Sequence, residues 1–371
     1  ILMRLEYAAC GCLLTLLIGA SVNAETLTPL ETLGKTLFFD DSLSEPAGQS
    51  CASCHAPEAG FADPDRHQPT SEGVNPGLFG VRNTPSVAYA AFSPVFRFDV
   101  TEGIFIGGQF WDGRASDLEE QAGQPFLNPL EMANTDSEMV VNKVRRSGYA
   151  SRFEELFGDG ALADVETAFT HIATAIGAYE RSSEISPFTS KYDAFLAGDV
   201  ALTAREKLGL ELFEREDKGN CAACHPSKTS AGGAPPLFTD FSYDNLGVPK
   251  NPANPFYRLP ESHNPEGARY LDLGLGGSLA VRSARENGKF KVPTLRNVAL
   301  TAPYMHNGVF YSLRDVVAFY NTRDTDARWG TPEIADNVNT EELGDLGLSD
   351  DEVDAVVAFM LILSDGYPSG D

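Results

Sequence analysis

Cys51-Ala52-Ser53-Cys54-His55 and Cys221-Ala222-Ala223-Cys224-His225 repeat one pattern in this 371-residue chain. Two cysteines at i and i+3, followed at once by histidine, form the attachment sequence of a c-type haem. The two thiols add to the vinyl groups and the imidazole binds the iron. A disulfide, a redox pair or half a zinc site would use the cysteines but would not need the adjacent histidine. The sequence therefore predicts two covalently bound haem c groups, held by Cys51, Cys54, His55, Cys221, Cys224 and His225.

The first 24 residues have the pattern of a secretory signal peptide. Arg4 precedes the apolar stretch Ala8–Ala20, and the small-residue sequence Ser21–Ala24 follows it. We expect cleavage after Ala24, which removes the remaining two of the six cysteines and places the mature protein in the periplasm. A buried first helix is the alternative. No later segment reaches about 18 uninterrupted apolar residues, so no transmembrane segment is expected.

The charge balance limits the partners. The chain has 28 Lys and Arg against 53 Asp and Glu, a formal net charge of −25. Phosphate backbones and anionic lipid surfaces are repelled by such a chain, so we expect no nucleic acid partner. A content of 42% hydrophobic residues is enough for about two domains with their own cores.

A second repeated pattern lies upstream of each haem motif. Leu33–Phe39 (LGKTLFF) precedes the first motif and Leu208–Phe213 (LGLELF) precedes the second. Because the same motif precedes both haem motifs, the sequence indicates a duplicated unit. We predict a mainly α fold of two cytochrome c-like helical haem domains with long irregular loops, the first in residues 25–190 and the second in residues 191–371.

Capping and periodicity signals locate several helices. Asp164–Glu180 has apolar residues at helical spacing and should close the first unit. Thr203–Glu206 has the form of a capping box, and Ser349–Leu363 begins with a capping residue and an acidic first turn. The Pro-, Gly- and Asn-rich stretches Asp63–Phe110 and Ser227–Lys289 are expected to be loops over the haem edges, and no strand-rich region is expected.

Together these and further motifs make the chain similar to a known superfamily. The motifs are LGKTLFFDDSLS, SCASCH, GFADP, RNTPS, FWDGRA, LEEQAGQPFLNPLEM, SPFTSKYDAF, CAACH, FKVPTLRNVALTAPYMHNG and LRDVVAFYN. They resemble the bacterial di-haem cytochrome c peroxidase superfamily from about Leu33 to Leu363. GGQFWDGRA, GQPFLNP and PYMHNGVF resemble its MauG-type branch most closely, whose best known member completes the tryptophan-derived cofactor of methylamine dehydrogenase.

The resemblance bears on the coordination of the first haem. Ordinary members of the superfamily carry a distal histidine sixteen residues after the haem histidine, and here that position is Ser71. His67, four residues away, is the alternative ligand. We expect the first haem to be five-coordinate through His55, with an open position for peroxide.

The second haem has several candidate axial ligands. The residues alone leave a shortlist of Met305, His306, Tyr311, Tyr320 and Met360. The resemblance implies Tyr320, because ordinary members place a methionine fourteen residues after the histidine of the PYxHxG motif and MauG-type members carry tyrosine there. A phenolate is hard and anionic and favours the higher oxidation states of iron, whereas a thioether favours the ferrous state.

Four further residues are implied to be catalytic by the resemblance. Trp111 matches an indole that relays electrons between the haems. Glu131 matches a distal carboxylate, which in a dry pocket has a raised pKa and can move the protons of peroxide. Gln121 matches a distal hydrogen-bonding partner and Pro125 a residue of the pocket lining.

A calcium ion between the two haem units is also implied. Asn83, Thr301 and Pro303 match the positions that supply its oxygen ligands, and carbonyl and amide oxygens suit this hard cation. Asn and Pro in loops ordinarily need no ion.

The chain departs from the resemblance at one position. The methylamine dehydrogenase maturation enzyme has an exposed tryptophan two residues before its second haem motif, which passes oxidising equivalents to the protein substrate. Here that position is Gly219, and the one tryptophan besides Trp111 is Trp329. Either another surface residue takes this role or the substrate docks differently.

These observations favour a periplasmic di-haem oxidoreductase that uses hydrogen peroxide. High-valent iron shared between both haems through Trp111 would oxidise a Trp or Tyr side chain of a partner protein. Two alternatives stay open: a cytochrome c peroxidase that takes electrons from a small cytochrome c or cupredoxin, and a di-haem electron carrier without substrate turnover.

Overall fold

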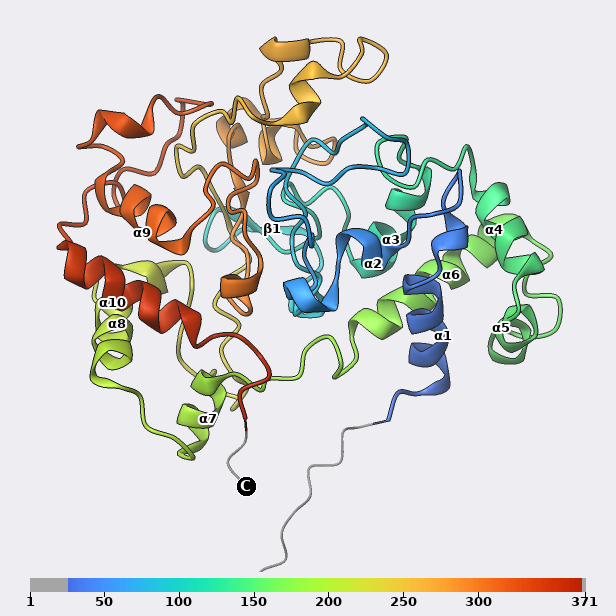
Figure 1. The fold of residues 1–371 in the computed structure, drawn as a ribbon, viewed down its shortest axis with the longest axis horizontal. Coiled ribbons are helices and arrows are strands. Elements are labelled where there is room, and N and C mark those ends of the chain that lie inside the picture. Colours follow the sequence, from blue (N-terminus) through green and yellow to red (C-terminus); the bar gives the residue numbers. More distant parts are fainter. Residues whose placement is uncertain (1–25, 369–371) are drawn as a thin grey trace, which may run out of the picture.

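The computed structural model describes residues 26–368, and the predicted signal peptide, residues 1–24, lies outside the described residues. The fold is mainly helical, which confirms the predicted class (Figure 1). The helices are α1 (Pro29–Phe38), α2 (Cys51–Cys54), α3 (Leu118–Leu127), α4 (Ser137–Arg146), α5 (Ala150–Phe157), α6 (Val165–Glu180), α7 (Lys191–Ala197), α8 (Ala204–Glu214), α9 (Leu313–Thr322) and α10 (Asp350–Leu361).

The first core is built on the crossing of α1 and α6. Leu33, Leu37 and Phe38 on α1 pack with Ile172 and Ile176 on α6, and all five are almost completely buried. Each such side chain contributes roughly 1.5–3 kcal/mol when it leaves water. Helices α3, α4 and α5 complete this core, which lies on the right in Figure 1.

The first repeated motif owes its glycine to this crossing. A Cβ at Gly34 would lie 1.8 Å from the backbone oxygen of Ala175, so the backbones of α1 and α6 approach at a point where only glycine fits.

The second core repeats the arrangement with α8 and α10. A Cβ at Gly209 on α8 would lie 2.0 Å from the backbone oxygen of Ala355 on α10. Leu212 and Phe213 of the same motif are buried against Phe359 of α10. The two LG motifs therefore occupy equivalent places in two similar helix pairs, as the duplication predicted.

The predicted helix starts are confirmed. Asp164 accepts from the backbone N–H of Thr167 at the start of α6. Thr203 and Ser349 form capping boxes with Glu206 and Glu352, respectively, at the starts of α8 and α10.

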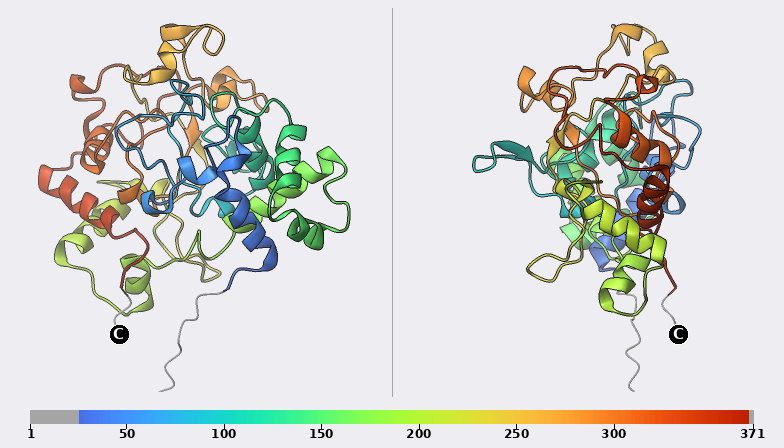
Figure 2. Two further views of the ribbon diagram at one scale, coloured as in Figure 1. Left: turned by 45° about the vertical axis from the view of Figure 1, so that its right-hand side comes forward. Right: turned by 90° about the vertical axis from the view of Figure 1, so that its left-hand side faces the viewer.

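Irregular chain fills the space between the two helical groups. The strands within the described residues form two short antiparallel pairs, β1 (Arg97–Asp99) with β2 (Ile104–Ile106) and β3 (Tyr243–Asp244) with β4 (Phe290–Lys291). The β1–β2 hairpin projects from the body of the molecule in the right-hand view of Figure 2. The rest of the stretches from Asp63 to Phe110 and from Ser227 to Lys289 is mostly turns and short 3-10 helices, as expected.

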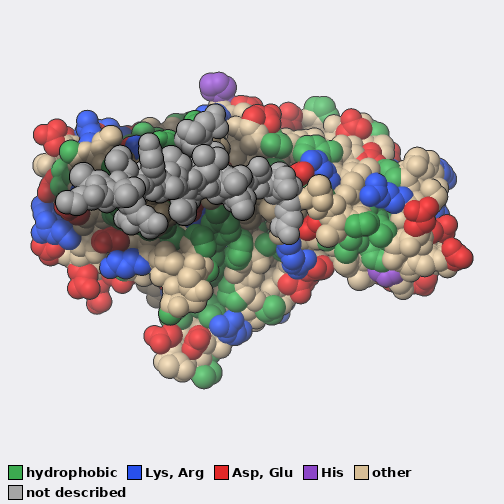
Figure 3. All heavy atoms as spheres, turned by 90° about the horizontal axis from the view of Figure 1, so that it is seen from below, with side chains coloured by type: hydrophobic (Ala, Val, Ile, Leu, Met, Phe, Trp, Pro, Cys, Tyr) green, Lys and Arg blue, Asp and Glu red, His purple; other side chains and the backbone are tan. Residues whose placement is uncertain are grey.

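Between residues 26 and 368, no helix combines the length and apolar character needed to cross a membrane. Acidic and basic side chains are interspersed along the edge of the face shown in Figure 3.

Candidate functional site: two haem cavities

The first cavity contains the first haem motif. It has a volume of about 350 Å³, within the roughly 300–1,000 Å³ typical of ligand and cofactor pockets. Helix α2 is one turn long, so Cys51 and Cys54 lie on one face of it. Their thiols form no disulfide, and burial raises the pKa of Cys54 to about 12. These thiols are therefore free to form thioether bonds to a haem.

His55 is oriented as an iron ligand. Its Nδ1 lies 3.2 Å from the backbone oxygen of Phe61. A carbonyl only accepts, so Nδ1 carries the proton and Nε2 holds the lone pair for a metal. Burial lowers the pKa of His55 to about 4, so the imidazole is neutral at pH 7.

Of the second motif, His225 lines the second cavity, which has a volume of about 200 Å³. Cys221 begins a 3-10 turn, and His225 closes it by donating its backbone N–H to the Cys221 oxygen at 2.9 Å. His225 Nδ1 lies 2.7 Å from the backbone oxygen of Phe238, and burial lowers the pKa of this imidazole as well. Both histidines are therefore fixed in the same tautomer by the same kind of contact.

Three residues that the resemblance implied to be catalytic line the first cavity. Gln121 and Pro125 lie one turn apart on α3, and Glu131 follows in the next loop. Asn128 Nδ2 donates to Glu131 Oε1 at 2.7 Å. Burial raises the pKa of Glu131, against the smaller effects of Arg114 and of this hydrogen bond. Glu131 is thus held in one orientation with its proton affinity increased.

His67 does not reach the first cavity. Its side chain is exposed, whereas Ser71 lines the cavity and hydrogen bonds to Asp63 and Thr84. In the part of the chain that the structure describes, His55 is the one histidine in this lining. The position opposite His55 thus receives no second imidazole from these residues.

The second cavity brings together most of the shortlisted ligands. Met305, His306, Tyr320 and Met360 all line it. Tyr311 does not: its side chain is 47% exposed.

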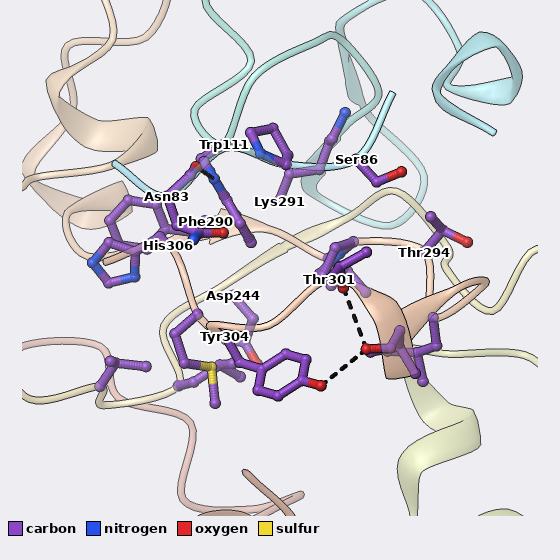
Figure 4. Close-up of a pocket in the computed structure, with 18 of the residues that line it drawn as sticks. Asn83, Ser86, Trp111, Asp244, Phe290, Lys291, Thr294, Thr301, Tyr304 and His306 are labelled. Carbon is purple, nitrogen blue, oxygen red and sulfur yellow. Dashed lines mark hydrogen bonds between the residues drawn. The ribbon is translucent and has the colours of Figure 1, made fainter. Parts of the chain in front are cut away.

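His306 and Met360 have other contacts. The His306 ring stacks on Phe290 with centroids 3.6 Å apart and planes 9° apart (Figure 4). Met360 is buried in the second core on α10.

Tyr320 extends from α9 into the second cavity. Among residues 26–368 no hydrogen bond to its hydroxyl contributes to the pKa of this side chain. Burial raises the pKa of this phenol, and the nearby Cys224 and Cys221 raise it further. A phenolate at this place needs a cation beside it, and ferric iron held by His225 would supply that charge.

Trp111 lies in the wall between the two cavities. It lines both of them, together with Phe110 and Gln109. Its Nε1 donates to the backbone oxygen of Asn83 at 2.8 Å, and its own backbone oxygen accepts from Lys291 N at 2.8 Å. The indole is therefore fixed through its N–H and the Trp111 backbone through its oxygen. Asn83, Trp111 and Lys291 lie near one another in Figure 4.

The three residues matched to a calcium site share one cavity, the second, without a hydrogen bond among them. Asn83, Thr301 and Pro303 line it. Asn83 Nδ2 donates to the Pro69 oxygen at 3.2 Å, and its Oδ1 accepts no hydrogen bond from the described residues. Among these residues no group of three or more His, Cys, Asp or Glu could hold a metal ion, so a cation here would be bound by amide and carbonyl oxygens.

Several charged residues of the site were not predicted from the sequence. Arg82 lies between Asp112 and Asp272 and is 2.7 Å from each carboxylate, and all three are largely buried. Lys291 donates to the Gly108 oxygen at 2.6 Å, and burial lowers its pKa to about 8. Asp112, in the FWDGRA motif, was the one local signal of this network.

Glu180 is a second carboxyl of the first cavity that sequence reasoning missed. It ends α6, is 3% exposed and leaves its Oε2 without a partner among the described residues. Burial raises its pKa to about 8.

Two partly buried cysteine pairs, each followed by an oriented histidine, define the class of di-haem c-type proteins, and comparisons with known proteins agree. A family model described as di-haem cytochrome c peroxidase matches residues 28–201. The methylamine utilization protein MauG of Paracoccus denitrificans is 42% identical, over 96% of this chain and 95% of its own. The cytochrome c551 peroxidase of Pseudomonas aeruginosa is 34% identical, over 91% of this chain and 79% of its own.

Solved structures give the same result. The crystal structure of the diheme peroxidase BthA from Burkholderia thailandensis has a TM-score of 0.80 and 38% sequence identity, covering 92% of this chain and 87% of its own. The chain belongs to the di-haem cytochrome c peroxidase family, in its MauG-type branch. It is a peroxidase-type oxidoreductase that acts on peroxide.

Proposed function

We propose that this protein uses hydrogen peroxide to oxidise a Trp or Tyr side chain of a partner protein in the periplasm. The observation that carries the proposal is the composition of the second cavity, which is lined by both Tyr320 and His225. Trp111 lies in the wall that this cavity shares with the first cavity. The 42% identity to a methylamine utilization protein MauG supports the same function.

The haem groups would be held by this chain's own residues in two domains, 25–190 and 191–371, after removal of residues 1–24. Cys51 and Cys54 would bind the first and Cys221 and Cys224 the second, with His55 and His225 as iron ligands. Bound haem supplies an iron that accepts oxidising equivalents from peroxide. Tyr320 would complete the second site, where its anionic oxygen favours the oxidised metal.

Glu131 would move the protons of peroxide. Its Oε2 is free of the Asn128 bond, so in its ionised form it can take a proton from one peroxide oxygen and return it to the other. Gln121 would hydrogen bond the bound peroxide, and Pro125 would keep the pocket closed on that side. The overall change uses two electrons and two protons for each peroxide and yields two waters. The partner supplies the electrons.

A calcium ion would connect the two halves of the site. Asn83 Oδ1 and the backbone oxygens of Thr301 and Pro303 would bind it. Because Asn83 also accepts from the Trp111 indole through its backbone oxygen, the ion would fix the wall that both cavities share.

A cytochrome c peroxidase that takes electrons from a small cytochrome c or cupredoxin is the second candidate. The 34% identity to the cytochrome c551 peroxidase of Pseudomonas aeruginosa favours it. The absence of a second histidine among the described residues of the first cavity argues against a site that must be unblocked by reduction.

The deciding experiment adds peroxide to the fully ferric protein in the presence of a protein encoded by a neighbouring gene. We expect peroxide consumption without prior reduction and a mass change on a Trp or Tyr of that protein. The Tyr320→Met variant should lose the mass change, because a thioether favours the ferrous state. Consumption that requires prior one-electron reduction, with no mass change on the partner, would instead support the cytochrome c peroxidase.

A further inference from the structure

Haem groups bound through the two cysteine pairs would fill the cavities, so an oxidisable residue at the surface is the place where electrons of a protein substrate would enter. Trp and Tyr are the side chains that lose an electron most readily. The chain has two tryptophans, and Trp111 lies in the inner wall between the cavities. Trp329 is the other, and its surroundings connect it to the second cavity.

Trp329 belongs to an unbroken group of aromatic rings, the Trp329 cluster, made of Phe310, Phe319, Tyr320 and Trp329. The centroids of Tyr320 and Phe319 are 6.2 Å apart, and those of Phe319 and Trp329 are 5.5 Å apart. Phe310 contacts both Phe319, at 5.1 Å, and Trp329, at 5.5 Å. The cluster therefore runs from the wall of the second cavity to Trp329 through ring contacts alone.

The outer end of the cluster lies at the surface. Trp329 is partly exposed, and its neighbours Arg328 and Gly330 are exposed. Its Nε1 donates to Thr322 Oγ1 at 2.9 Å, which ties the ring to the C-terminal end of α9. The indole is thus held in a fixed place where a docked protein can touch it.

We propose that Trp329 is the residue through which electrons enter from the partner protein. This inference rests on the proposed function. In each step Trp329 passes one electron inward through the Trp329 cluster to the second site. A Trp or Tyr of the partner then gives one electron to the oxidised Trp329 and restores it. Two such steps, with two protons, reduce one hydrogen peroxide to two waters and leave the partner oxidised by two electrons.

Arg328 tunes this residue. Its guanidinium lies 4.3 Å from the centroid of the Trp329 ring and pairs with Asp326 at 3.0 Å. A cation over an indole is attracted to the neutral ring and opposes its loss of an electron. An oxidising equivalent therefore does not settle on Trp329, and this protects the indole from damage.

Position 219 is closed to a similar role. A Cβ at Gly219 would lie 2.5 Å from the backbone oxygen of Leu212, so any side chain there would collide with the end of α8.

A rival route exists at the first cavity, where Tyr270 lines the wall. The ring centroid of Phe256 lies 5.1 Å from that of Tyr270 and 6.4 Å from that of the partly exposed Tyr257.

The first test needs no partner. The haem-loaded protein is treated with hydrogen peroxide, and peptide mass spectrometry measures oxygen addition at each Trp and Tyr. We expect Arg328→Gln to increase oxygen addition at Trp329 at least threefold over the native protein, because the opposing charge is gone. An unchanged level at Trp329 with oxidation gathered at Tyr257 or Tyr270 would overturn the proposal.

The second test uses reduced cytochrome c, a basic protein donor suited to an acidic chain. Trp329→Phe, which keeps an aromatic ring, should slow its oxidation about tenfold or more, equivalent to about 1.4 kcal/mol in the barrier. Tyr311→Phe, an exposed neighbour outside the Trp329 cluster, is the matched control and should leave the rate unchanged. A normal rate in Trp329→Phe with a lost rate in Tyr270→Phe would assign the function to the rival route. If the native protein does not consume peroxide in its ferric state, the proposed function itself fails.

Discussion

The indole N–H of Trp111 donates to the backbone oxygen of Asn83 at 2.8 Å, inside the wall that separates two cavities. Because Asn83 also lines both cavities, this one bond fixes the geometry between them.

Replacing Trp111 with Phe should weaken electron transfer between the two sites. The ring is kept, but the bond to Asn83 is lost and an oxidisable indole is replaced by a ring that resists oxidation. We expect oxidation of a protein donor to fall roughly tenfold or more. Unfolding free energy should fall by about 1–3 kcal/mol, because the Asn83 oxygen loses a buried donor. Chemical denaturation and donor oxidation measure the two effects, and a variant with both values unchanged would contradict the role of Trp111.

Glu131→Gln should slow the reaction with peroxide by about 10²-fold or more, since the amide cannot accept a proton. The native rate should fall as the pH drops through the raised pKa of Glu131, above the ordinary range of a glutamate, because only the carboxylate takes the proton. The variant should lose this acid limb. Stopped-flow mixing across pH measures it, and Glu58→Gln, an exposed acid, is the control. An acid limb that persists in Glu131→Gln would assign the titration to another group.

Glu180 should make the fold less stable as the pH rises. Its folded-state pKa is raised to about 8, above the ordinary value of 4.5, so its stabilising effect is complete below about pH 4.5. The effect is lost as the pH rises toward 8, at about 1.4 kcal/mol per pH unit while the unfolded chain alone is ionised. Denaturation at pH 5, 6, 7 and 8 should show this slope in the native protein and a flatter one in Glu180→Gln. Equal slopes would show that Glu180 ionises freely in the fold.

Gly34→Ala and Gly209→Ala should each destabilise the protein by about 1–3 kcal/mol or more, because a methyl group would push apart two helix backbones. Gly148→Ala is the matched control: a Cβ there meets no atom within 4 Å, and the effect should stay within about 0.5 kcal/mol. Thermal unfolding of the haem-loaded proteins compares the three. Similar values for all of them would mean that the helix pairs can separate without cost.

Local signals made much of the fold predictable. Capping at Thr203 and Ser349 depends on residues three positions apart, and the haem motifs on five consecutive residues, so each is complete within a short window. Glu131, Gln121 and Trp111, which the resemblance implied, all line the first cavity. The resemblance could not show that the glycines of the LG motifs are needed for helix contact, since their partners lie more than 100 residues away.

The buried charged residues of the site could not be predicted either, because their partners are also distant in the sequence. Arg82 and Asp272 are 190 residues apart in the chain, and nothing near either residue shows that they meet. Glu180 is the last residue of the predicted helix Asp164–Glu180, and only the packed structure shows which face of α6 borders the first cavity.

The shared walls have a consequence for how the protein matures. Tyr270, from the C-terminal half, lines the cavity of the first haem motif, and Asn83 to Ser86 and Trp111, from the N-terminal half, line the cavity of the second. The first pocket is lined almost entirely by the N-terminal half, whereas the second pocket is completed only when the two halves dock. A separately produced C-terminal half should therefore expose its prosthetic group to solvent, while a separately produced N-terminal half should keep its own largely covered.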